Sequence, residues 1–144
     1  MKTRIIIFNS LLLILFAFSC NTEDEVDSQE SIIEDLLTIE GGRWFAEGQT
    51  GLVLDECDKH TNYTFLENGN LQFEIYDDSS GTCEIGVSIS GIWKLISETE
   101  LVLLFEGQTS IVNIESVTVD VLVLSWKLED ETVTYILDKS QGNG

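Results

Sequence analysis

The sequence predicts an all-β domain, an antiparallel up-and-down barrel of eight strands with a short N-terminal helix. Beyond residue 42, most of the chain consists of runs in which apolar and polar residues alternate, as in half-buried strands. Short turns join these runs in simple succession, and the 144 residues include no proline to interrupt strand pairing. Such a sheet leaves exposed edges unless it closes, and closure gives a barrel.

The helix is expected at residues 31–37. Ser31 and Glu34 have the spacing of a capping box, in which each residue bonds the other's backbone at a helix start. Two isoleucines and two leucines follow at helical spacing and share one face. Gly41 and Gly42 end the helix.

Eight strands are expected after the helix, at residues 43–49, 62–66, 71–76, 86–96, 100–105, 109–115, 118–128 and 131–137. Asn68-Gly69 between two of these runs is a strong hairpin signal, and Glu129-Asp130 forms a tight turn before the last strand. Alternation places one set of side chains inside the barrel, namely Val87, Ile89, Gly91, Trp93, Leu95, Leu122, Leu124, Trp126 and Leu128.

The N-terminal twenty residues look like a bacterial lipoprotein signal peptide. Lys2 and Arg4 precede an apolar run, residues 5–18, that ends at Ser19-Cys20. A membrane-spanning helix needs about 20 apolar residues, whereas signal-peptide cores have about 7–15. We expect cleavage before Cys20 and lipidation of Cys20, which anchors the protein at the outer membrane or cell surface. The alternative is an ordinary secretory signal with Cys20 as a free thiol.

Three segments follow from this interpretation. Residues 1–19 are the signal peptide, residues 20–30 an acidic, flexible tether, and residues 31–144 the barrel domain. An acidic cluster just after the lipidated cysteine resembles a signal for transfer to the cell surface in Bacteroidetes lipoproteins. Cys57 and Cys83 then lie in an exported domain, where two cysteines most simply form a disulfide.

The order of motifs in the barrel resembles that of a known family. The motifs are Gly42-Arg43-Trp44, Cys57, Tyr63-Thr64-Phe65, Gly69, Cys83 and Gly91-Ile92-Trp93. This order, over residues 37–139, resembles the lipocalin-like domains of Bacteroidetes-type surface lipoproteins, and the resemblance implies that Cys57 and Cys83 pair. The resemblance implies that Gly42 and Trp44 form a barrel-end motif in which Trp44 plugs one end. Lipocalins often stack a late arginine on that tryptophan, and Lys139 is the late cation placed to substitute here.

Composition argues against several functions. The net charge of −19, from 26 acidic and seven basic residues, repels nucleic acid. None of the acidic clusters has the spacing of an EF-hand calcium loop. His60 is the sole histidine, so the common zinc sites and histidine-dependent nucleophilic catalysis are not expected. We expect no cofactor, no metal and no catalytic residue, and hence no enzyme.

Binding is the function class that remains. An eight-stranded barrel is either filled by side chains or holds one small ligand. The candidate cavity-lining residues are Phe65, Phe73, Trp93, Phe105, Trp126 and Tyr135, although core packing explains the same aromatics. We therefore expect a small apolar or amphipathic ligand. The alternative is a packed-core module whose acidic loops, residues 55–60 and 77–82, engage a protein or glycan partner. Interior volume discriminates the two, since ligand pockets typically measure about 300 Å³ or more.

Overall fold

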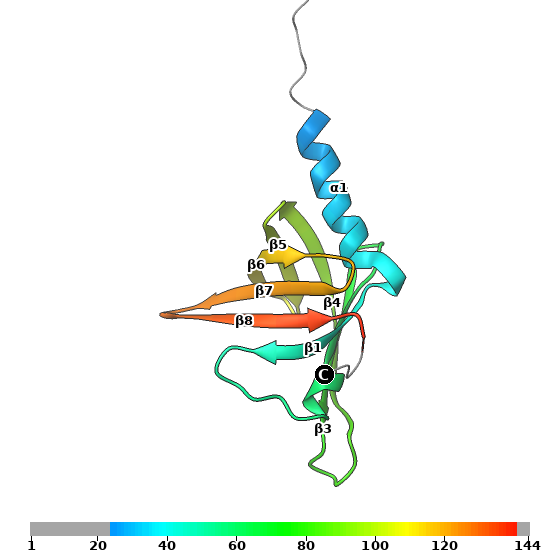
Figure 1. Ribbon diagram of the computed structural model, residues 1–144, viewed down its shortest axis with the longest axis vertical. Coiled ribbons are helices and arrows are strands. Elements are labelled where there is room, and N and C mark those ends of the chain that lie inside the picture. The colour runs from blue at the N-terminus through cyan, green and yellow to red at the C-terminus, as the bar shows by residue number, and fades with distance from the viewer. Residues whose placement is uncertain (1–23, 141–144) are drawn as a thin grey trace, which may run out of the picture.

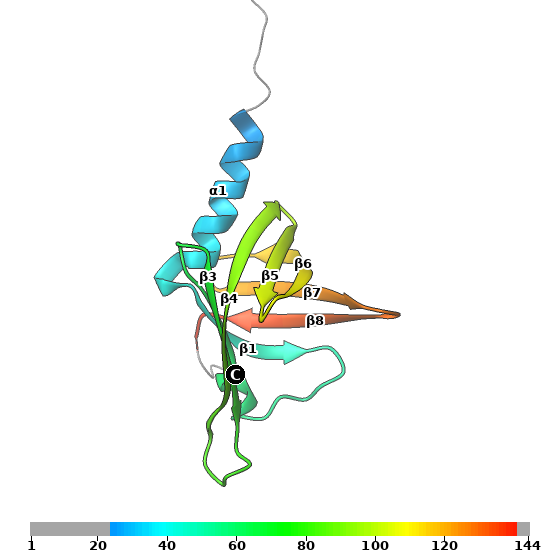
Figure 2. The same ribbon diagram turned by 180° about the vertical axis from the view of Figure 1, so that it is seen from behind.

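The computed structural model describes residues 24–140 and confirms the closed, eight-stranded antiparallel barrel (Figures 1 and 2). The strands are β1 (Arg43–Gln49), β2 (Asn62–Phe65), β3 (Asn70–Asp77), β4 (Glu84–Ser97), β5 (Glu100–Phe105), β6 (Gln108–Val117), β7 (Val121–Leu128) and β8 (Glu131–Asp138). Each strand pairs with its neighbours in sequence, and β8 closes the barrel by pairing with β1, for example Leu137 with Ala46. The predicted signal peptide and Cys20 lie outside the described residues.

The helix is longer than predicted. Helix α1 spans Asp24–Thr38, and a 3₁₀ turn, η1 (Ile39–Gly41), joins it to β1. Residues 24–30, which we predicted as flexible tether, are therefore helical, and Ser31 lies inside the helix, where it cannot serve as a cap. The prediction took the hydrophilic segment for a linker, but acidic residues are favoured in the first turns of a helix. No helix within residues 24–140 is long and apolar enough to cross a membrane.

The β6–β7 connection also differs from its prediction. Strand β6 continues to Val117, and β7 begins at Val121 rather than at residue 118. The Thr118 hydroxyl accepts hydrogen bonds from the backbone N–H of Asp120, at 3.3 Å, and of Val121, at 3.0 Å. A threonine hydroxyl that bonds the backbone two and three residues on forms a turn in place of a strand.

The core lies inside the barrel and is formed by alternate residues of every strand. Its members include Leu37, Trp44, Phe65, Leu71, Trp93, Leu95, Leu101, Leu103, Val112, Leu122, Leu124 and Leu137. Two residues expected on the inner face are exposed, Val87 and Leu128. Leu128 lies beside the β7–β8 turn, beyond the pairing of β7 with β6, and Val87 lies where β4 extends beyond its pairing with β5, so each has a paired strand on one side only.

The β3–β4 hairpin extends beyond the barrel wall, at the bottom of Figure 1. Strand β4 pairs with β3 from Glu84 onward, but its pairing with β5 begins only at Gly91. The outer part of this hairpin, β3 residues 75–77 with β4 residues 84–87, is therefore a two-stranded ribbon. A shift in register between Ile75 and Tyr76 marks a β-bulge in the ribbon.

Candidate functional site: a cavity at the open end of the barrel

One end of the barrel is closed by Trp44. This side chain is fully buried, and its indole N–H donates a hydrogen bond to the carbonyl oxygen of Leu37, at 2.9 Å, in the last turn of α1. Lys139 covers the ring, with its Nζ 4.1 Å from the ring centroid, and donates a 2.6 Å hydrogen bond to the Ile39 carbonyl oxygen. Burial lowers the pKa of Lys139 to about 8, against the opposing effect of the Glu40 carboxylate. A ligand must therefore enter at the opposite end.

Gly42 allows the closed end to form. Its φ of +71° is a left-handed conformation, and a Cβ at this position would collide with the backbone carbonyl of Phe65. The Phe65 N–H donates a 2.8 Å hydrogen bond to the Gly42 carbonyl oxygen, which holds β2 against the start of β1. The glycine of the Gly42-x-Trp44 motif is thus required by a close backbone approach as well as by its backbone angle.

The open end contains a cavity of about 250 Å³. It is lined by Ala46, Gly48, Gln49, Leu52, Leu54, Asp58, Thr61, Tyr63, Phe73, Ile75, Tyr135 and Leu137. Strands β1, β2, β3 and β8 supply its walls, and the loop between β1 and β2 supplies Leu52, Leu54 and Asp58. The volume falls just below the usual range for ligands of drug size, so the cavity suits a smaller molecule.

Two of the six predicted cavity-lining aromatics, Phe73 and Tyr135, line this cavity. The other four do not. Phe65 and Trp93 are buried in an edge-to-face contact, with ring centroids 5.6 Å apart. Phe105 and Trp126 pack against the buried core cluster. These four aromatics fill the barrel interior. Alternation correctly places them on the inner face, but they lie along the barrel axis at levels where other core side chains surround them.

Tyr63 is a cavity residue that the prediction missed. Its side chain is 7% exposed and lies stacked on Phe73, with ring centroids 4.3 Å apart. No residue within the described range forms a hydrogen bond with its hydroxyl group. Burial, with a smaller electrostatic effect of Tyr135, raises the pKa of Tyr63 well above its usual value of 10. The signal was present in the sequence, since Tyr63 is two residues before Phe65 and shares its face.

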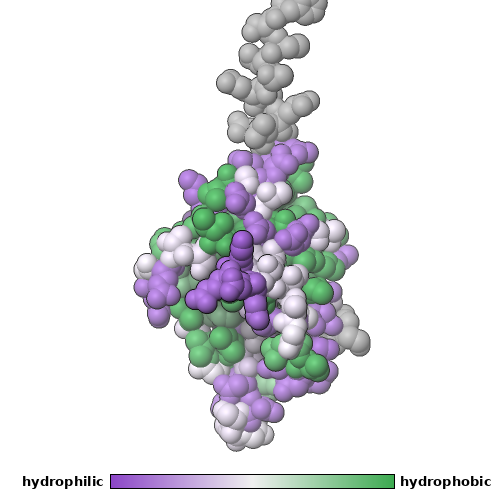
Figure 3. Space-filling view, turned by 90° about the vertical axis from the view of Figure 1, so that its left-hand side faces the viewer, coloured by the Kyte–Doolittle hydropathy of each residue, from purple (hydrophilic) through white to green (hydrophobic). Residues whose placement is uncertain are grey.

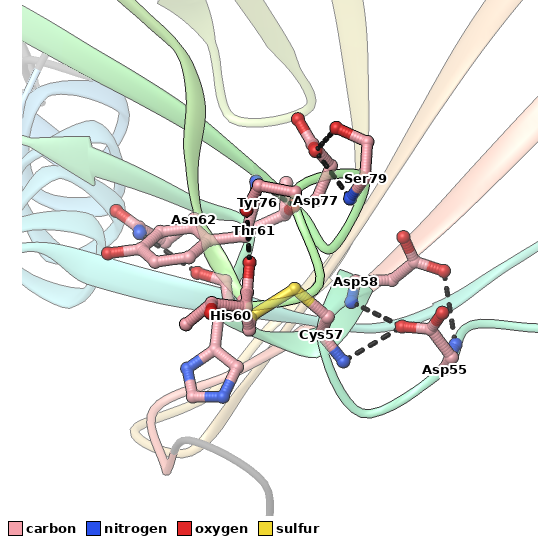
Figure 4. Close-up of a disulfide and its surroundings, with 12 residues drawn as sticks. Asp55, Cys57, Asp58, His60, Thr61, Asn62, Tyr76, Asp77 and Ser79 are labelled. Atoms are coloured by element: carbon pink, nitrogen blue, oxygen red, sulfur yellow. Dashed lines mark hydrogen bonds between the residues drawn. A yellow bond between two sulfur atoms is a disulfide. The ribbon is translucent and has the colours of Figure 1, made fainter.

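A disulfide between Cys57 and Cys83 is confirmed beside the entrance (Figure 4). It joins the β1–β2 loop to the start of β4, with 26 residues of sequence separation. A 3₁₀ turn, η2 (Asp58–His60), follows Cys57. The Asp55 carboxylate accepts bonds from the N–H groups of Cys57 and Asp58, both at 2.8 Å, and the Asp58 carboxylate accepts one from the Asp55 N–H at 3.1 Å. This reciprocal pair fixes the loop that carries Asp58.

The second acidic loop lies on the other side of the disulfide. The side-chain and backbone donors of Ser79 both bond the Asp77 carboxylate, and these bonds lower the pKa of Asp77. The Tyr76 N–H donates to the Thr61 hydroxyl at 3.2 Å, which connects β3 to the residue that follows η2. The two predicted acidic loops are therefore brought together at the entrance.

Other hollows are less suited to a small ligand. A groove of about 340 Å³ lies between α1 and β6, with Ile32, Leu36 and Ile114 among its lining, but it is an open depression on the outside of the barrel. Among residues 24–140, no group of three or more His, Cys, Asp or Glu side chains is arranged to hold a metal ion. His60 lies against Tyr76, with ring centroids 5.5 Å apart.

Comparison with solved structures shows a structural likeness. The chain is similar to a solved structure of the bovine lipocalin allergen Bos d 2, with 14% sequence identity, a TM-score of 0.40, and coverage of 71% of this chain and 72% of that chain. No protein-family model and no curated protein matches the sequence. The fold itself is given by the strand pairing, which forms a closed, eight-stranded, up-and-down meander.

Proposed function

We propose that this protein binds a small apolar or amphipathic molecule in the open end of its barrel. The observation that supports the proposal is the 250 Å³ cavity, whose walls are mostly apolar and include Tyr63, a largely buried side chain whose hydroxyl forms no hydrogen bond with another described residue. Binding sites for small molecules are concave and largely apolar, with a few polar groups that orient the ligand. At about 250 Å³ the cavity is smaller than a typical ligand pocket, so the interaction module with acidic loops is kept as the alternative.

The rim of the entrance supports an amphipathic ligand. Leu52 is 53% exposed although it lines the cavity, and its neighbour Val53 is 93% exposed. Ile75, on the opposite side, is also partly exposed and lines the cavity. Apolar side chains on both sides of an opening give an entering apolar group contact before it is fully buried.

The test is a binding measurement with a cavity-filling variant. Ala46→Phe places a ring in the cavity, and Ile136→Phe makes a similar addition on the outer face of β8, where the side chain is 43% exposed. Both variants should fold, as judged by circular dichroism. Titration of wild type with a panel of small apolar and amphipathic compounds, followed by tryptophan fluorescence, should give a ligand that Ala46→Phe no longer binds and Ile136→Phe still binds. Unchanged binding by Ala46→Phe would place the site elsewhere.

We also propose that the protein is exported and anchored by lipid on Cys20. The supporting observations are the signal-like N-terminal sequence and the Cys57–Cys83 disulfide, since disulfides persist mainly in oxidising compartments. Cys20→Ser should move the protein from the membrane fraction to the soluble fraction of cells while the disulfide still forms. Membrane association that survives the substitution would contradict lipid anchoring. The proposal is for binding and not for catalysis.

A further inference from the structure

The charge around the cavity is strongly one-sided. The four loops at the open end, residues 50–61, 78–83, 106–107 and 129–130, carry seven carboxylates, those of Asp55, Glu56, Asp58, Asp78, Glu106, Glu129 and Asp130. They carry one lysine, Lys59, whose ammonium group lies 3.8 Å from Glu47 and 3.7 Å from Glu56. Figure 3 looks onto this end, where hydrophilic residues project between apolar patches. The entrance is therefore a region of negative potential, which attracts cations and repels anions.

The other described cations lie away from the entrance. Arg43 and Lys139 line a hollow at the closed end. Lys94 and Lys127 alternate along their strands with the inward-facing Trp93 and Trp126 and so lie on the outside of the barrel. A carboxylate ligand would thus meet no cation in the cavity. Asp58 is the one charged residue among those that line it.

The aromatic side chains that line the cavity, together with Trp126 packed behind them, also favour a positively charged ligand. Tyr63 and Phe73 form one stacked pair, and Trp126 and Tyr135 form an edge-to-face pair with centroids 4.9 Å apart. The two pairs meet, with the Tyr63 and Trp126 centroids separated by 6.3 Å. Aromatic faces attract cations, and a tyrosine hydroxyl accepts as well as donates hydrogen bonds. Tyr63 lines the cavity and its hydroxyl forms no hydrogen bond with another described residue, so the hydroxyl can accept an N–H from a ligand.

We propose that the ligand is a small organic cation, an amine with an aromatic or apolar body. This inference rests on the proposed binding function and specifies its ligand class. The apolar body lies among Tyr63, Phe73 and Tyr135, and the ammonium group is directed toward the Asp58 carboxylate at the entrance. The acidic loops raise the local concentration of such a cation, while the cavity volume limits it to a compound about the size of a single-ring arylalkylamine.

The test uses three ligands of one skeleton that differ in charge. We would titrate the protein with phenethylamine, 2-phenylethanol and phenylacetate at neutral pH by isothermal titration calorimetry. The amine should bind about tenfold or more tightly than the carboxylate, and added salt should weaken the binding of the amine alone. If the carboxylate binds as well as the amine, the cation proposal is overturned and the cavity function stands. If no member binds to folded protein, the arylalkylamine proposal is overturned, and the binding function is decided separately by the compound panel and the Ala46→Phe variant.

A matched pair of variants tests the role of Asp58. Asp58→Asn removes the charge but keeps an oxygen that can accept the hydrogen bond from the Asp55 N–H. Asp78→Asn removes one charge from the neighbouring loop, outside the cavity lining. Asp58→Asn should weaken amine binding about fivefold or more and leave the alcohol unchanged, and Asp78→Asn should have a smaller effect. Equal losses for amine and alcohol in Asp58→Asn would show that Asp58 acts through the loop fold and would overturn its charge role.

Discussion

The ammonium nitrogen of Lys139 lies 4.1 Å from the centroid of the Trp44 ring, so the residue that follows the last strand covers the first strand of the barrel. The same nitrogen donates a hydrogen bond to Ile39, which precedes β1. Two attractive contacts favour the charged lysine here, yet the pKa of Lys139 is lowered to about 8, because the cost of burying the ammonium group outweighs them. Folding therefore makes the Lys139 ammonium group easier to deprotonate than it is in the unfolded chain.

This relationship predicts a pH dependence of stability. The folded protein releases the Lys139 proton near pH 8, whereas the unfolded chain keeps it to about pH 10.5. Since the unfolded state binds more protons between these values, the contribution of Lys139 to the unfolding free energy rises with pH from 8 to 10.5. Urea denaturation at pH 7.5 and 9.5 should show this gain in wild type and its absence in Lys139→Met. Lys94→Met, at an exposed position, should behave as wild type, and parallel profiles for wild type and Lys139→Met would refute the prediction.

The raised pKa of Tyr63 predicts that the unfolding free energy falls with pH at higher pH values, opposite to the effect of Lys139. This raised pKa means that the unfolded chain loses the phenolic proton near pH 10 while the folded protein still holds it. The favourable contribution of neutral Tyr63 is complete below pH 10 and is lost as pH rises above that value. In denaturation experiments between pH 9 and 11, Tyr63→Phe should lose less stability than wild type. Tyr76→Phe, at a position outside the cavity lining, provides the control. A steeper loss in Tyr63→Phe would contradict the assignment.

Gly42 and Gly41 provide a matched pair for backbone strain. Both have positive φ, +71° and +82°, but a Cβ at Gly41 meets no atom within 4 Å, whereas one at Gly42 collides with the Phe65 carbonyl. Gly41→Ala should lower the unfolding free energy by about 1–2 kcal/mol, the cost of a left-handed conformation. Gly42→Ala should cost clearly more, because β1 and β2 must also separate. If the two variants lose the same unfolding free energy in thermal or urea denaturation, the close approach of Gly42 to the Phe65 carbonyl does not contribute to the cost.

The Cys57–Cys83 disulfide should contribute measurably to stability. Closing a loop with 26 residues of sequence separation stabilises a fold by about 3–4 kcal/mol in the chain-entropy model. The double variant Cys57→Ala/Cys83→Ala should lose about this much unfolding free energy in urea denaturation. Dithiothreitol should destabilise wild type by a similar amount and leave the double variant unaffected. Wild type that keeps its full stability after complete reduction would show that hydrogen bonds alone hold the entrance loops.

Local patterns predicted the barrel well. Asn68-Gly69 lies in the turn between β2 and β3, with Gly69 at φ +81°. Alternation placed Trp93 and Leu95 in the core, where both are buried. These features depend on residues close in sequence. Closure followed from strand order, since no other arrangement of a simple meander removes both edges.

The cavity was not predictable from the same patterns. Alternation shows which side of a strand a residue occupies, but not how far along the barrel axis neighbouring side chains close around it. Tyr63 and Phe65 share one face of β2, yet only Tyr63 reaches the cavity. An internal space is the small difference between the volume the backbone encloses and the volume the side chains fill. The extended start of α1 was missed for a related reason, because hydrophilic composition alone does not separate an exposed helix from a linker.

The ribbon formed by the outer part of the β3–β4 hairpin has a consequence for access to the interior. Because β4 residues 84–90 pair with β3 alone, this wall of the entrance can bend outward without breaking a hydrogen bond to β5. The opposite wall, β8 between β7 and β1, has partners on both sides and is held in place. The entrance therefore has one rigid wall, β8, and one wall that can bend, the outer part of the β3–β4 hairpin. The Cys57–Cys83 disulfide connects this hairpin to the β1–β2 loop and so limits how far it can bend.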